Sequence, residues 1–378
     1  MESVSPIGIA VVGGGYWGPN LVRNAQQTPG LRLEYLCDLD ADRARAVLGD
    51  YSTVRISTSL DDVLADPAVQ AVAIATPAAT HFSVGMQALE AGKHVLIEKP
   101  LAPSYDQGRQ LVEAAERLGR VLMVDHTFCY TSEVRHIRET VRSGRLGDLQ
   151  YLDSVRINLG IVQPDVDVLW DLAPHDLSIF DAILPDDVAP VSVAAHGSDP
   201  VGAGHACVAH LTLRLSNGGL AHVHVNWLSP TKIRTFVVGG SKRTIIWDDL
   251  NPTQRLSEHD RGVERNDELA DLDADVRGRR LVSYRTGDTV APALANLEAL
   301  RSVMVEFAAA IAENRRPLTD GFAGLRVLAI LEAASESLAK DGQSVPIRAV
   351  QQTPRETAGV IENVATTMAQ RGRGEVTV

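Results

Sequence analysis

Lys99 is a candidate catalytic residue because it lies just after a predicted buried strand. The sequence Glu98-Lys99-Pro100 directly follows the apolar run His94–Ile97, which predicts a buried strand. Lysine is usually exposed, and parallel sheets bind their ligands at the carboxyl ends of their strands. There the Lys99 ammonium could hold a hydroxyl or carbonyl oxygen and stabilise its charge during hydride transfer. A solvated salt bridge from Glu98 to Lys99 is the structural alternative.

Asp171 and His175 are a second candidate pair, four residues apart in a predicted helix. Residues with this spacing share one helix face. Histidine accepts protons near neutral pH, and the carboxylate could orient it or contact a substrate directly. Pro174 falls early in the helix, where proline is tolerated. The structural alternative is a capping acid beside a packed histidine.

A glycine-rich loop follows the first predicted strand. Gly13, Gly15 and Gly18 satisfy GxGxxG, with Tyr16 and Trp17 between the last two. The first glycine makes the tight turn, the second lets the backbone approach a pyrophosphate, and the third lets helix and strand pack closely. The next helix offers free amide groups to the anion. This loop predicts dinucleotide binding.

The second predicted strand ends at Asp38, in the position of the acid that binds the cofactor ribose. An acid there accepts hydrogen bonds from both ribose hydroxyls of NAD and repels the 2′-phosphate of NADP. We therefore expect NAD as the cofactor, with NADP less favoured. A helix-capping role for Asp38, ahead of Asp40, is the structural alternative.

Further candidates are suggested by position only. His81 follows the fourth predicted strand, near the expected nicotinamide, although it could instead cap the next helix. His126 ends the last strand of the first domain and could line the same crevice. Three residues on or after a later strand could bind a polar or anionic substrate, with exposure to water as the alternative: Arg156, Asn158 and Gln163. His222 and His224 alternate on a strand without a third ligand at a telling spacing, so we expect no metal site.

The elements around these residues indicate two domains. In the first third, apolar runs alternate with helical patterns, which predicts parallel β-α-β units in a sheet covered on both faces. The expected strands are Ile7–Val12, Leu31–Cys37, Ala71–Ala75, His94–Ile97 and Val121–Val124. The expected helices are Pro19–Gln27, Asp40–Leu48, Thr80–Ala91 and Ser104–Leu118.

After about residue 126, segments with period-two alternation predict an antiparallel sheet with one apolar face. In the first of them, residues 151–159, Val155, Ile157 and Leu159 point away from Arg156 and Asn158. Two more segments, 207–215 and 220–228, flank an Asn217-Gly218-Gly219 turn that predicts a hairpin. The expected helices are Ser132–Ser143, Asp171–Leu184, Ala291–Glu313 and Gly321–Lys340.

We therefore expect an α/β Rossmann domain with a doubly wound parallel sheet at residues 1–126. An α+β domain with a large open-faced, mostly antiparallel sheet should occupy residues 127–350, and residues 351–378 should form a polar tail.

Composition excludes several classes of protein. The net charge of −12 argues against a broad nucleic-acid interface, which would be basic. No apolar run could span a bilayer, and the N-terminus lacks a secretory pattern. Cys37, Cys129 and Cys207 form no CxxC pair, which argues against zinc or a disulfide framework. We expect a cytoplasmic enzyme without a nucleic-acid or membrane partner.

Together these residues resemble the glucose-fructose oxidoreductase/inositol dehydrogenase (Gfo/Idh/MocA) family, to about residue 348. The resemblance rests on the Gly13–Gly18 loop, Ala75-Thr76-Pro77 with His81, Glu98-Lys99-Pro100, the Asp171–His175 pair, and Glu332-Ala333-Ala334 with Ser337. Residues 15–24 and 170–176 also resemble a bacterial subgroup that includes UDP-N-acetylglucosaminuronate 3-dehydrogenases and related nucleotide-sugar oxidoreductases.

The resemblance implies that Lys99 and His175 are catalytic, with Asp171 alongside. His175 would take the hydroxyl proton as hydride leaves for the nicotinamide. Cofactor contacts are implied for the glycine loop and for Thr76, Pro77, His81, Glu98 and Lys99. The family also implies an active site between the two domains, and homodimers or homotetramers formed through the open sheet.

The resemblance favours an NAD-dependent oxidoreductase that acts on a ring hydroxyl or ketone of a nucleotide-linked sugar. Three alternatives stay open. The chain could be a dehydrogenase of free polyols or aminocyclitols, an NAD-dependent glycosidase with a transient oxidation, or a non-catalytic dinucleotide-binding regulator. Retention of Lys99, Asp171 and His175 argues against the regulator, which needs no proton acceptor.

Overall fold

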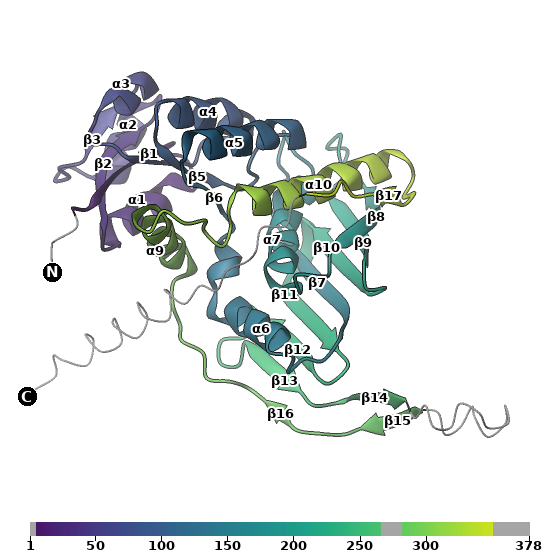
Figure 1. Cartoon of the computed structure of the whole chain (residues 1–378). Coiled ribbons are helices and arrows are strands. Elements are labelled where there is room, and N and C mark those ends of the chain that lie inside the picture. Colours follow the sequence, from purple (N-terminus) through teal and green to yellow (C-terminus); the bar gives the residue numbers. More distant parts are fainter. Residues whose placement is uncertain (1–4, 266–281, 351–378) are drawn as a thin grey trace, which may run out of the picture. The chain divides into compact units, whose positions relative to one another are not determined.

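The computed structural model describes residues 5–265 and 282–350 of the 378-residue chain. These residues divide into two compact units, whose elements are labelled in Figure 1. Unit 1 contains residues 5–131, 297–329 and 350, and unit 2 contains residues 132–265, 282–296 and 330–349. Residues 297–329, which we expected in the second domain, are therefore counted with the first. The expected polar tail, 351–378, lies outside the described residues.

Unit 1 is built on a six-stranded sheet with the order β3-β2-β1-β4-β5-β6, in which every neighbouring pair is parallel. Its strands are β1 (Ile7–Val12), β2 (Leu31–Cys37), β3 (Arg55–Ser57), β4 (Ala71–Ile74), β5 (His94–Glu98) and β6 (Leu122–Asp125). The order reverses between β1 and β4, and doubly wound sheets bind dinucleotides at this switch point.

Two pairs of helices pack together in unit 1, α1 beside α9 and α4 beside α5 (Figure 1). The helices of this unit are α1 (Gly18–Gln27), α2 (Ala41–Leu48), α3 (Leu60–Ala65), α4 (His81–Glu90), α5 (Tyr105–Leu118) and α9 (Ala299–Ala312), with short 3₁₀ turns η1 (Ala78–Thr80) and η2 (Thr127–Tyr130). Capping explains the ends of α5: the Gln107 amide donates to Ser104 Oγ, and Gly119 is left-handed at φ 61°.

Strands β1, β4, β5 and β6 are largely buried on both faces, as their continuous apolar runs predicted. Ile9, Val11, Ile74, Leu96 and Ile97 are each no more than 1% exposed. The predicted strands and helices of this unit are confirmed to within a few residues, except that α9 begins at Ala299 and not at the predicted Ala291. The sequence analysis missed β3 and α3, which are too short to give a periodic signal.

Unit 2 contains a nine-stranded sheet with the order β16-β13-β12-β11-β7-β10-β9-β8-β17, in which only the β7–β10 pair is parallel. Its strands are β7 (Leu149–Leu159), β8 (Pro190–Ser198), β9 (Val208–Leu215), β10 (Leu220–Asn226), β11 (Leu228–Gly240), β12 (Thr244–Asp248), β13 (Leu256–His259), β16 (Thr289–Val290) and β17 (Val345–Pro346). A separate hairpin pairs β14 (Gly262–Arg265) with β15 (Val282–Arg285). The mostly antiparallel sheet is therefore confirmed.

Helices α6 (Ser132–Arg142) and α7 (Val168–Ile183) pack together in unit 2, and α7 contacts strands β7, β9 and β10 (Figure 1). The apolar set of β10 is buried, whereas His222 on its other face is exposed. The predicted hairpin is confirmed, with Gly218 at φ 87° between β9 and β10. Helix α10 (Gly321–Ala339) begins among residues of unit 1 and ends among residues of unit 2.

The two faces of β7 alternate as predicted, but the face that carries Arg156, which we expected to meet substrate or water, packs against α7. Ser154 and Arg156 are the residues that point into the buried layer, at 3% and 5% exposure, because Asp176 on α7 binds both. Since successive residues of a strand alternate, Val155 and Ile157 lie on the other face. A buried partner on α7 thus overrides the apolar pattern of the strand. No helix in the described part of the chain is long and apolar enough to cross a membrane.

Candidate functional site

The glycine loop between β1 and α1 has the shape that its three glycines predicted. Gly13 has φ 99°, and a Cβ there would lie 2.7 Å from the Ala75 carbonyl oxygen. A Cβ on Gly18 would collide with the Gly13 carbonyl. At Gly15, by contrast, a Cβ would meet no atom within 4 Å. Two glycines are therefore required by close packing, and the third leaves the backbone open to a ligand.

Asp38 is bound to this loop. The Gly14 amide donates to Asp38 Oδ2 at 2.6 Å, and the Asp40 amide donates to Oδ1 at 2.8 Å. Arg43 Nη1 lies 3.3 Å from the same Oδ1. Asp38 does not cap the next helix, because the cap of α2 is Asp40, which accepts from the Asp42 and Arg43 amides. The capping alternative for Asp38 is therefore excluded.

These residues fit the adenosine half of NAD. The amides of the open loop would hold the pyrophosphate, and Asp38, at the carboxyl end of β2, would hold the ribose. The fit rests on the open space at Gly15 and on an acid fixed beside the loop.

Lys99 lies where the sequence predicted, directly after β5 at the carboxyl edge of the sheet. Thr76 and Pro77 follow β4 at the same edge, so these residues and the glycine loop share one side of unit 1. The neighbouring Glu98 accepts weakly from the Lys99 amide through Oε2, at 3.3 Å. The parallel sheet therefore brings together the groups expected to hold the nicotinamide end of the cofactor.

His81 connects two of these segments. It is 1% exposed, with Nδ1 2.7 Å from the Pro100 carbonyl oxygen and Nε2 2.9 Å from that of Thr76. Burial is the main cause that lowers the pKa of His81, and the positive charge of Lys99 acts in the same direction. The ring thus ties the segment after β4 to the segment after β5. This placement favours a positioning role over an exposed cofactor contact.

Next to Lys99 lie two carboxyl groups with buried oxygens, those of Glu98 and Asp125. Strands β5 and β6 are paired in register, so that Glu98 lies opposite Asp125, which is 1% exposed. Burial, together with the negative charge of Asp125, raises the pKa of Glu98 well above its usual range. His126 follows Asp125 and is also only 1% exposed, so its side chain does not lie on an open surface of unit 1.

In unit 2, Asp171 and His175 lie on α7 one turn apart. The helix begins earlier than predicted, because Asp167 accepts from the Trp170 amide at 2.9 Å and supplies the cap. The indole of Trp227 donates to Asp171 Oδ2 at 3.0 Å. Whereas most of α7 is buried, Asp171 and His175 are both partly exposed. The arrangement is that of a carboxylate and an imidazole reachable from one side of the helix.

The ion pair between Arg156 and Asp176 holds α7 against the sheet. Nε and Nη2 of Arg156 lie 2.9 and 3.0 Å from the two Asp176 oxygens, and Ser154 donates to Asp176 at 2.7 Å. Arg156 is therefore embedded in the layer between β7 and α7, which favours a positioning role over the expected substrate contact. Asn158 and Gln163 are half-buried, and no contact of theirs in the described structure indicates a ligand.

Sequence reasoning missed three residues of these sites: Asp125, Asp176 and Trp227. Asp125 ends β6 at the same edge of the sheet as Lys99, which directly follows β5, and that position could have identified it. Asp176 and Trp227 carried no signal, because their partners come from other strands and helices. Contacts between residues that are far apart in the chain cannot be recognised from a single sequence.

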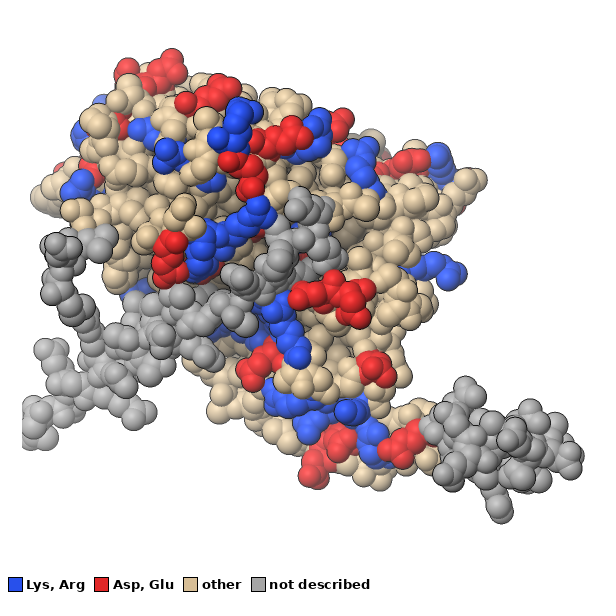
Figure 2. All heavy atoms as spheres, in the orientation of Figure 1, with Lys and Arg blue, Asp and Glu red and all other residues tan. Residues whose placement is uncertain are grey.

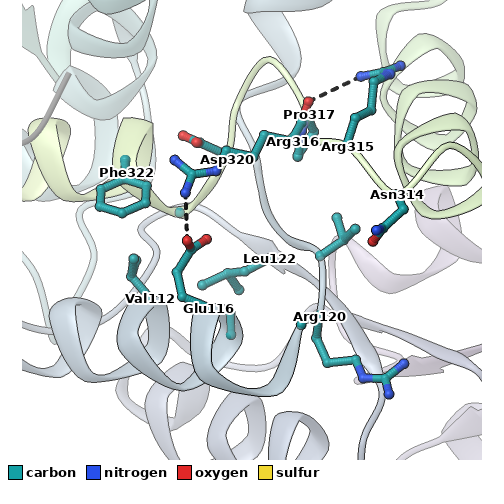
Figure 3. Close-up of a pocket in the computed structure, with 14 residues that line it drawn as sticks. Val112, Glu116, Arg120, Leu122, Asn314, Arg315, Arg316, Pro317, Asp320 and Phe322 are labelled. Carbon is teal, nitrogen blue, oxygen red and sulfur yellow. Dashed lines mark hydrogen bonds and ion pairs between the residues drawn. The ribbon is translucent and has the colours of Figure 1, made fainter. Parts of the chain in front are cut away.

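A hollow of about 200 Å³ in unit 1 lies away from these residues, at the amino end of β6 (Figure 3). It is lined by the end of α5 and by residues 314–322. Two of its three arginines are paired with acids, Arg316 with Glu116 at 2.6 Å and Arg315 with Glu306 at 2.7 Å. Acidic and basic side chains are similarly interspersed on the face of unit 1 seen in Figure 2. Because the hollow is at the opposite edge of the sheet, it is not the cofactor site.

Known proteins share both halves of this arrangement. The profile of an oxidoreductase family with an NAD-binding Rossmann fold, Gfo/Idh/MocA, matches residues 7–126, and the Gfo/Idh/MocA C-terminal domain matches residues 134–246. UDP-N-acetylglucosamine 3-dehydrogenase of Acidithiobacillus ferrooxidans is 30% identical over 79% of this chain and 87% of its own. A crystal structure of that enzyme superposes with a TM-score of 0.73 at 27% identity, covering 90% of this chain and all of the other. Inositol 2-dehydrogenase of Corynebacterium glutamicum is 29% identical over 49% of this chain and 56% of its own.

Proposed function

The chain belongs to the Gfo/Idh/MocA family of NAD-binding oxidoreductases, and we propose that it moves a hydride between a ring carbon of a nucleotide-linked sugar and the nicotinamide. The substrate is a sugar ring with a free secondary hydroxyl, or the matching ketone, attached to a nucleoside diphosphate. Lys99 and His175 are the catalytic groups, and Asp171 assists His175.

One observation supports the substrate class: the similarity to UDP-N-acetylglucosamine 3-dehydrogenase extends over 87% of that enzyme. Both the cofactor-binding half and the substrate-binding half of the chain are therefore included. Lys99 lies within residues 7–126, which match the profile of the NAD-binding domain. Asp171 and His175 lie within residues 134–246, which match the profile of the C-terminal domain.

The proposed reaction needs a proton acceptor, a group that stabilises the oxygen, and a hydride acceptor. When bound, NAD⁺ supplies the last of these. His175 takes the proton from the substrate hydroxyl while the carbon–hydrogen bond breaks and the carbon–oxygen double bond forms. The Lys99 ammonium holds the same oxygen and stabilises its developing negative charge. In the direction of ketone reduction, His175 returns the proton to the oxygen.

The chain's other residues keep these groups in place. The Trp227 indole holds Asp171 from the end of the strand. The Arg156–Asp176 pair holds the helix that carries both Asp171 and His175. The His81 ring lies between the backbone carbonyls of Thr76 and Pro100, in the segments that follow β4 and β5. Such supporting contacts fix catalytic geometry to the fraction of an ångström that hydride transfer requires.

A free cyclitol dehydrogenase is the second candidate, because inositol 2-dehydrogenase is 29% identical to part of this chain. The two candidates differ in one measurable property. An enzyme for nucleotide sugars should bind a nucleoside diphosphate by itself, whereas an enzyme for cyclitols has no group to hold one.

The test is NADH formation by the full chain with NAD⁺ and a substrate panel. The panel contains UDP-, dTDP- and GDP-sugars, including uronates, beside free inositols and aminocyclitols. An aminotransferase with its amino donor removes the ketone and pulls an unfavourable oxidation forward. Turnover of a nucleotide sugar supports the proposal, and turnover of free cyclitols alone replaces it with the second candidate. Intact NAD binding with no turnover in either direction would overturn both and favour a regulator.

A further inference from the structure

The carboxyl groups of Glu98 and Asp125, next to Lys99, each have a buried oxygen without a hydrogen-bond donor in the described part of the chain. Glu98 and Asp125 are register partners on adjacent strands, so their side chains leave the sheet on the same face. Glu98 Oε1 and Asp125 Oδ2 are both buried, and neither accepts a hydrogen bond from an N–H or hydroxyl group in the described part of the chain. Burial, followed by the negative charge of Asp125, raises the pKa of Glu98. The two neighbouring oxygens can satisfy one another only through a hydrogen bond between them. A bond between two carboxyl groups forms only when one of them carries a proton.

The surroundings distinguish the two acids. Asp125 Oδ1 accepts from the Thr127 hydroxyl at 2.7 Å, and this bond opposes the rise that burial causes in the pKa of Asp125. Among the described residues, Glu98 accepts only the long contact from the Lys99 amide through Oε2. The acid that accepts the stronger hydrogen bond keeps the negative charge, and the other holds the proton.

We propose that Glu98 is a neutral carboxylic acid in the working enzyme, held protonated by an ionised Asp125, and that this proton keeps negative charge away from Lys99. Asp125 is thus a positioning residue that acts through Glu98. The inference rests on the proposed function in one respect, namely that Lys99 stabilises the oxygen of the substrate.

The reaction explains why the place of this charge matters. During oxidation, negative charge develops on the substrate oxygen held by Lys99. A carboxylate on the adjacent residue would oppose that charge, and burial would weaken the screening between them. With the proton on Glu98, the nearest carboxylate charge of the pair belongs to Asp125, on the neighbouring strand. No proton is gained or lost by the pair in a catalytic cycle.

The protonation state can be measured without activity. Infrared difference spectra between H₂O and D₂O report the carbonyl stretch of a protonated carboxylic acid. The full-length protein at neutral pH should show this band, and Glu98→Gln should remove it. Asp320→Asn is the matched control, since Asp320 is a buried acid of unit 1 whose carboxylate caps a helix by accepting from the Ala323 amide. The control should retain the band. A wild-type protein without the band would overturn the proposal.

Kinetics test the role of the charge. Asp125→Asn removes the neighbouring charge, so that Glu98 ionises and the negative charge moves next to Lys99. We expect kcat at neutral pH to fall on the order of tenfold, and to recover as pH falls and Glu98 is protonated again. In a Glu98→Gln background no ionisation is possible, so adding Asp125→Asn should lower kcat by less than about twofold.

The double-variant comparison separates charge from structure. If Asp125→Asn lowers kcat equally in both backgrounds, or if the low-pH recovery is absent, Asp125 is merely structural and the proposal is wrong. The infrared measurement needs no substrate, so a missing band would contradict only the assignment of a proton to Glu98. If the wild-type protein shows the band but oxidises no sugar, the proposed function is wrong and the proton assignment stands.

Discussion

Arg156 and Asp176 form a two-point ion pair in the buried layer between β7 and α7, with nitrogen–oxygen distances of 2.9 and 3.0 Å. Their side chains are 6% and 2% exposed. Asp176 is adjacent in sequence to His175, so the pair fixes the helix at the residue next to the proposed proton acceptor. An ion pair in this position controls the orientation of the proposed catalytic face of α7.

Removing one member of this pair should destabilise the protein strongly. Arg156→Met leaves the Asp176 carboxylate buried without its partner, and we expect the free energy of unfolding to fall by about 3–5 kcal/mol. Replacing both residues, as Arg156→Met with Asp176→Leu, should recover much of this loss because no charge is left uncompensated. Urea unfolding followed by circular dichroism measures both variants.

The exposed pair between Arg109 and Glu113, 2.5 Å apart on α5, provides the control. Arg109→Ala should change the free energy of unfolding by less than about 1 kcal/mol, since exposed ion pairs contribute little. Equal losses at the exposed and the buried pair would contradict the assigned role of Arg156.

Asp38 should determine the choice between NAD and NADP. Asp38→Asn keeps an oxygen for the Gly14 amide but removes the charge that repels a 2′-phosphate, and Arg43 is close enough to attract one. We expect the ratio of kcat/KM for NADP to that for NAD to rise on the order of tenfold or more. The measurement is steady-state kinetics with both cofactors.

Asp40→Asn is the matched control, because Asp40 caps α2 two residues further on and asparagine caps equally well. Cofactor preference should not change in this variant. If Asp38→Asn behaves like Asp40→Asn, the ribose is bound by another residue.

Lys99→Ala should remove catalysis and spare cofactor binding. The ammonium acts on the developing charge of the substrate oxygen, so kcat should fall by about 10²-fold or more, whereas NAD affinity, measured by fluorescence titration with NADH, should stay close to that of the wild type.

Lys93 offers a comparison, since it is another lysine of unit 1, 8% exposed, whose ammonium donates to the Val69 carbonyl at 2.7 Å. Lys93→Met should lower stability and leave kcat unchanged. A loss of NADH binding in Lys99→Ala as large as the loss of kcat would contradict the catalytic role of Lys99.

Much of unit 1 could be predicted because its signals are local. The GxGxxG loop, the acid after β2 and the lysine after β5 are each recognised from a few neighbouring residues, and parallel sheet geometry places them on one edge. The environment of each group could not be predicted. Burial of Glu98 against Asp125, and of His81 between two carbonyls, depends on strand register and on loops that meet only in the folded chain.

Unit 2 shows the limit of periodicity more sharply. The alternation in β7 was read correctly, but its faces were assigned by the rule that apolar residues point inward. Arg156 breaks this rule because Asp176, twenty residues later, supplies two oxygens in the buried layer. A sequence shows which residues share a face and does not show which face a distant helix will cover.

His94 should make the stability of the protein depend on pH. Its Nδ1 accepts from the Val121 amide at 3.0 Å, which requires a bare nitrogen, and burial followed by the charge of Arg120 lowers the pKa of His94 to about 4. The ring is therefore neutral in the folded protein, while in the unfolded chain it titrates near the usual value of about 6.5. The unfolded state binds the extra proton. The contribution of His94 to the free energy of unfolding is therefore fully present above pH 6.5 and is lost as pH decreases towards 4.

The loss attributable to His94 should reach at most about 3 kcal/mol at the acid end of this window. His94→Asn retains an acceptor for the Val121 amide and cannot be protonated, so urea unfolding of this variant should depend less on pH between 6.5 and 4 than that of the wild type. His222→Asn is the control, since His222 lies on the exposed face of β10 beside Asp153 and should leave the slope nearly intact. Parallel pH slopes for wild type and His94→Asn would show that His94 is protonated equally in the folded and unfolded states, contrary to the buried acceptor geometry.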